Sequence, residues 1–204
     1  MQEYLQRAKD AKIELSQTTG KLRNDVLLQM AVALRAEYGF ILEANAKDME
    51  YAKGAGLSSA MLDRLLLDEK RISAMAASIK TIAGLRDPLG RVLEGWTLPN
   101  GLRIEKVSIP IGVVGVIYES RPNVTSDTAA LCFKSGNIAV LKGGKEAINS
   151  NNAIAKAMSD VLESFSLPKE IISMLPDSSR EGVMSLVKMD KYVDLIIPRG
   201  GESL

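Results

Sequence analysis

The sequence contains no histidine and a single cysteine, Cys132. Without histidine, Ser-His and Cys-His nucleophile pairs, imidazole general bases and most zinc sites are excluded. One cysteine cannot form an internal disulfide, and the start of the chain, MQEYLQRAKDAKIELSQ, is charged throughout, so we expect a cytoplasmic protein without a signal peptide. Cys132 lies between Leu131 and Phe133 in a helical stretch, which favours a buried structural thiol over a reactive nucleophile.

Long apolar runs and an excess of one charge are also missing. The most apolar stretch, IPIGVVGVIY, has the length of a strand and is too short to cross a bilayer. The 26 Lys and Arg residues nearly balance the 25 Asp and Glu residues, so no net field favours nucleic acid or an anionic membrane. Because the net charge is close to zero, any anion site must be a local feature. Because 46% of the residues are apolar, we expect a globular core.

Residues 1–85 carry apolar side chains at three- and four-residue steps, which predicts a helical segment. Its last helix is expected to begin after Asp68, a suitable N-cap, and to end at Gly84. We expect this segment to pack on the domain that follows.

Residues 86–110 form a different region. A turn-rich stretch, RDPLGRVLEGW, precedes alternating apolar residues whose phase slips at Glu105 and Lys106. This pattern predicts a bulged, partly exposed strand that could meet a partner subunit.

In residues 111–204, predicted strands and helices alternate, which is typical of a parallel sheet with right-handed crossovers. The fold class expected is therefore α/β: a helical N-terminal segment leading into a Rossmann-like sheet with helices on both faces. Ligands of such sheets bind beyond the carboxyl ends of the strands. The loops after Tyr118, Leu141 and Ile197 are thus the places to look.

The first of these loops contains Arg121, Pro122 and Asn123. One interpretation is structural: Asn123 caps the helix that follows. The other is chemical: its side-chain amide donates a hydrogen bond to a developing oxyanion.

In the second loop Lys142 and Lys145 flank two glycines. Many dinucleotide sites have an acidic residue here for the ribose 2′-hydroxyl, whereas a basic pair accepts a 2′-phosphate, which points to NADP. A solvated turn with surface lysines is the alternative.

The third loop contains Arg199, Gly200 and Gly201, followed by residues 202–204 that are compatible with a helix. A two-glycine turn after a strand can present backbone N–H groups to a phosphate. By itself it is a weak signal, because the full dinucleotide fingerprint and the P-loop motif are both absent.

Taken together, the segments MLDRLLLDEKRI, DPLG, GVIYESRPNVTSDTAALCFKSGNIAVLKGGKEA and MDKYVDLIIPRGG resemble the γ-glutamyl phosphate reductases (glutamate-5-semialdehyde dehydrogenases) of the aldehyde dehydrogenase superfamily. The resemblance extends over essentially the whole chain. It implies a proline-biosynthesis enzyme that reduces L-glutamyl 5-phosphate to glutamate 5-semialdehyde with NADPH and releases phosphate. The same domain forms half of the bifunctional pyrroline-5-carboxylate synthase, which is the alternative origin.

The resemblance also implies roles and partners. Asn123 would be an oxyanion-hole amide, and the full-length protein would be a homo-oligomer, with glutamate 5-kinase as a candidate partner and with no bound metal, nucleic acid or membrane. The cofactor residues expected at the strand ends are Tyr118, Glu119, Arg121, Lys142, Gly143, Gly144, Lys145, Glu146, Arg199, Gly200 and Gly201.

In this family the nucleophilic cysteine lies in a domain that follows the cofactor domain, and Cys132 does not match its position. We therefore expect this chain to be the amino-terminal, cofactor-binding portion of the enzyme, truncated and inactive alone. A nucleotide-binding module without catalysis and an interaction fragment are the competing interpretations.

Overall fold

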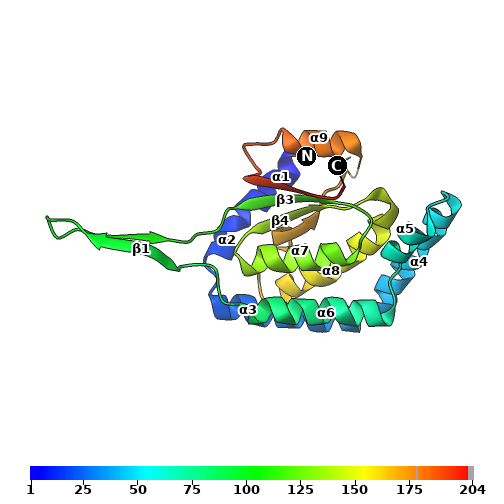
Figure 1. The fold of residues 1–204 in the computed structure, drawn as a ribbon, viewed down its shortest axis with the longest axis horizontal. Helices are drawn as coiled ribbons and strands as arrows, with labels where there is room; N and C mark the ends of the chain where they lie inside the picture. The colour runs from blue at the N-terminus through cyan, green and yellow to red at the C-terminus, as the bar shows by residue number, and fades with distance from the viewer. Residues whose placement is uncertain (178, 202–204) are drawn as a thin grey trace.

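The computed structural model describes residues 1–177 and 179–201, and it arranges them as layers of helices around a parallel sheet (Figure 1). The N-terminal helices are α1 (Gln2–Asp10), α2 (Lys12–Ser16), α3 (Gly20–Ala36), α4 (Tyr38–Gly54), α5 (Ser59–Leu65) and α6 (Glu69–Gly84). None of the helices in these described residues is long and apolar enough to cross a membrane.

The helix α6 has the limits that the sequence predicts. It begins after Asp68, whose carboxylate accepts a hydrogen bond from the N–H of Arg71, and it ends at Gly84. Its apolar face packs against that of α3, where Leu27 and Met30 are fully buried. Each such side chain contributes about 1.5–3 kcal/mol relative to an exposed one.

The central sheet contains β3 (Val113–Tyr118), β4 (Ile138–Lys142), β5 (Ile172–Met174) and β6 (Leu195–Arg199), all parallel, in the order β5-β4-β3-β6. All six residues of β3 are buried, as expected for a parallel strand that is covered on both faces. The helices α7 (Asn123–Lys134) and α8 (Ile148–Ser164) lie on one face of the sheet, and α1 and α9 (Arg180–Val187) on the other (Figure 1). The predicted α/β fold class is confirmed.

The helix α1 is fastened to the far edge of the sheet. The hydroxyl of Tyr4 lies 2.7 Å from Ser173 Oγ and donates to the carbonyl of Met174 at 3.0 Å. Burial raises the pKa of Tyr4 to about 12, so the phenol stays neutral and keeps its donor. The first helix is thereby held to the strand β5, near the other end of the sequence.

A two-stranded hairpin projects from the body of the molecule (Figure 1). Its strands are β1 (Val92–Thr97) and β2 (Arg103–Val107), which pair antiparallel. The sequence predicted only the second strand. It also placed the bulge at Glu105 and Lys106, whereas the register shifts in β1, between Val92 and Glu94.

Both errors have one physical cause. Every residue of β1 is exposed, and in β2 only Ile104 is partly buried. Because no core covers either face of the hairpin, the alternation of apolar residues does not report which side chains point inward, and its phase cannot locate a bulge.

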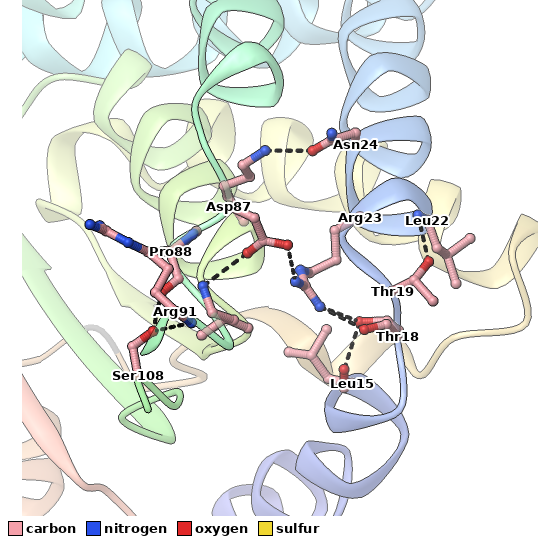
Figure 2. Close-up of polar contacts among 12 residues, drawn as sticks. Leu15, Thr18, Thr19, Leu22, Arg23, Asn24, Asp87, Pro88, Arg91 and Ser108 are labelled. Atoms are coloured by element: carbon pink, nitrogen blue, oxygen red, sulfur yellow. Dashed lines mark hydrogen bonds and ion pairs between the residues drawn. The ribbon is translucent and has the colours of Figure 1, made fainter. Parts of the chain in front are cut away.

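A buried arginine joins the helices to the hairpin (Figure 2). Arg23 on α3 is 4% exposed; it donates to the carbonyl of Thr18 at 2.7 Å and to Asp87 Oδ2 at 2.8 Å. A Cβ added at Gly20 would lie 2.1 Å from the same Asp87 oxygen, so glycine is the residue that leaves the carboxylate its place. The ion pair fixes the chain just after α6.

Further hydrogen bonds hold the two sides of the hairpin's base together (Figure 2). Asp87 Oδ1 accepts from the N–H of Leu89 at 3.0 Å. Ser108 Oγ donates to the carbonyl of Pro88 at 2.6 Å and accepts from the N–H of Arg91 at 3.0 Å. The base of the hairpin is therefore anchored to the helical layer by polar groups, although the strands beyond it are exposed.

We expect Arg23→Gln to lower the free energy of unfolding by about 2 kcal/mol, because it leaves partly buried acceptors without their charged donor. The matched control is Lys21→Gln, which removes a lysine that is paired with Asp25 at 2.6 Å but is 85% exposed; we expect a change below about 0.5 kcal/mol there. Urea denaturation followed by circular dichroism measures both. Equal changes in the two variants would show that the burial of Arg23 does not increase the contribution of its ion pair to the free energy of unfolding.

Candidate functional site

The candidate site lies where the strand order reverses. The chain passes from β3 to β4 on one side and reaches β6 on the other, so the carboxyl ends of β3 and β6 diverge and leave a crevice. A cavity of about 530 Å³ opens there. The predicted cofactor residues that line it are Tyr118, Glu119, Arg121, Glu146, Arg199 and Gly200.

The glycine turn after β6 has an acidic oxygen against its backbone. The N–H of Gly201 donates to Glu119 Oε1 at 3.0 Å, and a Cβ added at Gly200 would lie 2.7 Å from that oxygen. A backbone N–H of the turn therefore donates to an anionic oxygen, as a phosphate site requires. The predicted helix-compatible residues 202–204 lie outside the described residues.

Residues of the loop after β4 line two different cavities. Lys142, Gly143 and Gly144 line a separate, smaller cavity of about 110 Å³. Lys145 is exposed and borders neither cavity. Glu146 turns back toward the crevice, where its carboxylate accepts a hydrogen bond from Ser120 Oγ. The structure thus places the two lysines of this loop apart.

The side chain of Tyr118 points into the protein interior. It is 1% exposed, and its hydroxyl lies 2.6 Å from Thr125 Oγ1, which donates to Asn151 Oδ1 at 2.9 Å. Burial raises the pKa of Tyr118, so the phenol stays protonated. Asn151 Nδ2 would lie 2.1 Å from a Cβ at Gly143, which explains why glycine stands there. Tyr118 supports the loops and does not offer its hydroxyl to a ligand.

Asn123 lies beside a second cavity of about 480 Å³ between α5, α6 and α7. It is the first residue of α7, where Pro122 is the N-cap, so the interpretation of Asn123 as the capping residue is wrong. Its Nδ2 donates to Asp127 Oδ2 at 3.3 Å, and Asp127 Oδ1 accepts from Ser78 Oγ at 2.8 Å. The amide is therefore at a cavity wall with one long hydrogen bond.

Sequence reasoning missed the contribution of the helical segment. Met61 and Arg64 on α5 line the crevice, and Arg64 also lines the second cavity together with Arg121. Periodicity gives no signal for such residues, because exposed positions of a helix look alike in sequence. Both residues lie in the segment MLDRLLLDEKRI, which contributes to the family resemblance, but no role in the site was predicted for either of them.

Cys132 is a buried thiol, as predicted. It lies on α7 and is 8% exposed. Burial raises its pKa to about 12, so the nucleophilic thiolate is scarce at neutral pH.

Comparisons with known proteins agree on one family. The model of the aldehyde dehydrogenase family matches residues 1–203. Over the whole chain the sequence is 63% identical to the γ-glutamyl phosphate reductase of Nitratiruptor sp. and 64% identical to that of Sulfurimonas denitrificans, and it covers 50% of each. The chain therefore spans about half the length of these curated relatives.

Solved structures give the same result. The γ-glutamyl phosphate reductase of Thermotoga maritima superposes with a TM-score of 0.96 at 39% identity, over 99% of this chain and 49% of that one. The enzyme of Saccharomyces cerevisiae gives a TM-score of 0.88 at 36% identity, over 99% of this chain and 51% of that one.

We expect Cys132 to resist alkylation by iodoacetamide at pH 8 in the folded chain and to react fully in guanidinium chloride. Its pKa of about 12 keeps the folded thiol protonated, whereas unfolding returns it to the ordinary value near 8.5. Mass spectrometry of the labelled protein measures the extent of reaction. Rapid labelling of the folded chain would contradict the assignment of a structural thiol.

Proposed function

The chain belongs to the aldehyde dehydrogenase family, and on that basis we propose that it forms the NADPH-binding part of a γ-glutamyl phosphate reductase. The reaction is the reduction of L-glutamyl 5-phosphate to L-glutamate 5-semialdehyde by NADPH with release of phosphate, a step of proline biosynthesis. The observation that carries this proposal is the cavity at the diverging ends of β3 and β6, the position at which open α/β sheets bind dinucleotides.

The residues around this cavity fit the parts of a dinucleotide. The glycine turn would hold the pyrophosphate, since the N–H of Gly201 already bonds to an anionic oxygen and Arg199 stands at the cavity wall. Lys142 in the neighbouring cavity would meet the adenosine ribose and its phosphate.

Two features of the loop after β4 support NADPH over NADH. The acidic residue of this loop, Glu146, is engaged by Ser120, which leaves its carboxylate less able to accept the ribose 2′-hydroxyl. Lys142, which lines the neighbouring cavity, offers positive charge to a 2′-phosphate instead.

The chemistry requires an oxyanion donor and a nucleophile. Asn123 would donate its amide to the oxyanion, since its hydrogen bond to Asp127 is long, at 3.3 Å, and easily exchanged. The bound nicotinamide supplies hydride. We assign the cysteine nucleophile to the half of the relatives that this sequence does not span, because the Cys132 thiol is buried and protonated.

The hairpin is the proposed oligomer contact. Val92, Leu93 and Trp96 in β1 are all exposed apolar residues, and unpaired strand edges with apolar side chains pair readily with another chain. Glutamate 5-kinase is the proposed supplier of the acyl phosphate, and the proposed location is the cytoplasm.

We expect the chain to bind NADPH at least tenfold more tightly than NADH, because one charge-assisted contact to the 2′-phosphate is worth that factor. Lys142→Gln should reduce the difference. Lys80→Gln, which removes an exposed lysine of α6 away from the site, should leave it unchanged. Titration of nucleotide fluorescence measures each affinity. Equal affinities, or a preference for NADH, would contradict the assignment of Lys142.

In an enzyme that contains this sequence together with the remaining half of its relatives, we expect Asn123→Ala to lower kcat about a hundredfold, the usual effect of losing one oxyanion donor. The affinity for NADPH should change little. Gln29→Ala, at an exposed position of α3, is the control for removal of an amide side chain. Steady-state kinetics of NADPH oxidation with glutamyl phosphate separate kcat from KM, and an unchanged kcat would leave Asn123 a structural residue.

A further inference from the structure

The segment 61–72 places Arg64 at the boundary between the two cavities. The crevice at the ends of β3 and β6 and the cavity beside Asn123 share Arg64 and Arg121 in their walls. In the proposed reaction the first cavity receives the cofactor. The second adjoins it and contains the proposed oxyanion donor, which makes it the place for the acyl substrate. Arg64 and Arg121 therefore stand where cofactor and substrate would meet.

The backbone that carries Arg64 is held from one side by Arg71 on α6. This guanidinium donates to the carbonyl oxygens of Asp63 and Leu66, the latter at 2.8 Å, and to Asp63 Oδ1 at 2.6 Å. Its charge is thereby paired within the segment. Arg71 therefore stabilises the turn after α5, and few of its N–H donors remain for a ligand.

Asn45 on α4 holds the same turn from the other side. Its Nδ2 donates to the carbonyl of Leu65 at 2.9 Å and to Ser150 Oγ at 3.0 Å, and its Oδ1 accepts from the N–H of Leu67 at 2.8 Å. Asn45 is 2% exposed. Two side chains from different helices thus fix the turn, so that Arg64 is presented from a rigid backbone.

The two cavities are lined by as many acidic side chains as arginines, but the acidic side chains have partners: Arg71 donates to Asp63 and the N–H of Gly201 donates to Glu119. Asp127 is engaged by Ser78 and Asn123, and Glu146 by Ser120. In contrast, Arg64 and Arg121 have neither an ion pair nor a side-chain hydrogen bond to any residue that the structure describes. Two unpaired guanidinium groups that border the same cavities favour an anion between them, and their planar donor pairs match a phosphate.

We propose that Arg64 and Arg121 bind the phosphate group of the acyl phosphate substrate at this junction. The inference rests on the proposed function. The phosphate is attached to the carbon that receives the hydride, so it must lie beside the cofactor, whereas the α-carboxylate lies at the other end of the glutamyl chain. The cofactor's own pyrophosphate would instead be held by the glycine turn, through the backbone N–H of Gly201.

The test uses the purified chain and inorganic phosphate, the product that leaves this subsite. Phosphate affinity is measured by calorimetry with and without saturating NADP⁺ for the parent chain, Arg64→Gln, Arg121→Gln and Arg64→Lys. We expect each Gln variant to weaken phosphate binding about tenfold or more, the effect of one charge-assisted contact. Arg64→Lys should recover part of the lost affinity, since lysine keeps the positive charge but lacks the paired, planar N–H donors of a guanidinium group. Arg35→Gln, at an exposed position of α3 outside both cavities, should bind as the parent does.

The measurements with saturating NADP⁺ distinguish phosphate bound in the substrate subsite from phosphate bound where the cofactor's own phosphates would lie. If phosphate still binds when NADP⁺ is saturating, and Arg64→Gln weakens phosphate far more than NADP⁺, the substrate subsite is supported. If NADP⁺ displaces phosphate, or if either Gln variant binds phosphate as the parent does with an unchanged circular dichroism spectrum, the proposal is overturned. Failure of NADP⁺ to bind, with phosphate binding still dependent on both arginines, would count against the proposed cofactor function and in favour of the anion subsite.

Discussion

Burial of β3 on both faces is the constraint on which the rest of the structure depends. A strand with no exposed residue needs helices above and below it and a neighbour on each side. Because the chain leaves β3 for β4 on one side and joins β6 on the other, the loops at their carboxyl ends separate. The crevice is therefore a result of how the core is built, and the glycine turn and Arg199 reach it because β6 ends there.

The sequence predicts well those features that a core imposes. The alternation of strands and helices after residue 111, the limits of α6 and the burial of Cys132 all follow from apolar periodicity and from capping at Asp68. Three strand ends were found as candidate loops for the same reason, since strand order in α/β sheets determines where loops gather.

Features that no core imposes were not predictable in this way. The strand β1 is exposed on both faces, so its residues look like a turn region. Arg64 is an exposed position on a short helix, and its place at the junction depends on how Asn45 and Arg71 hold the next turn. Those contacts join residues that are far apart in the sequence, and a pattern of local spacing does not contain them.

The hydrogen bonds of Asn45 and Tyr4 have a consequence for the order of folding. Asn45 bonds to a serine 105 positions later, and Tyr4 to a serine 169 positions later. Asn45, which holds the turn that presents Arg64, therefore lacks one of its partners until α8 has been synthesised, and α1 has no edge to dock on until β5 emerges from the ribosome. The helices α3 and α6 can cover each other's apolar faces, but the apolar surface that packs on α8 and on the sheet stays uncovered until then. Such long-range contacts slow folding and leave partly folded chains prone to aggregation.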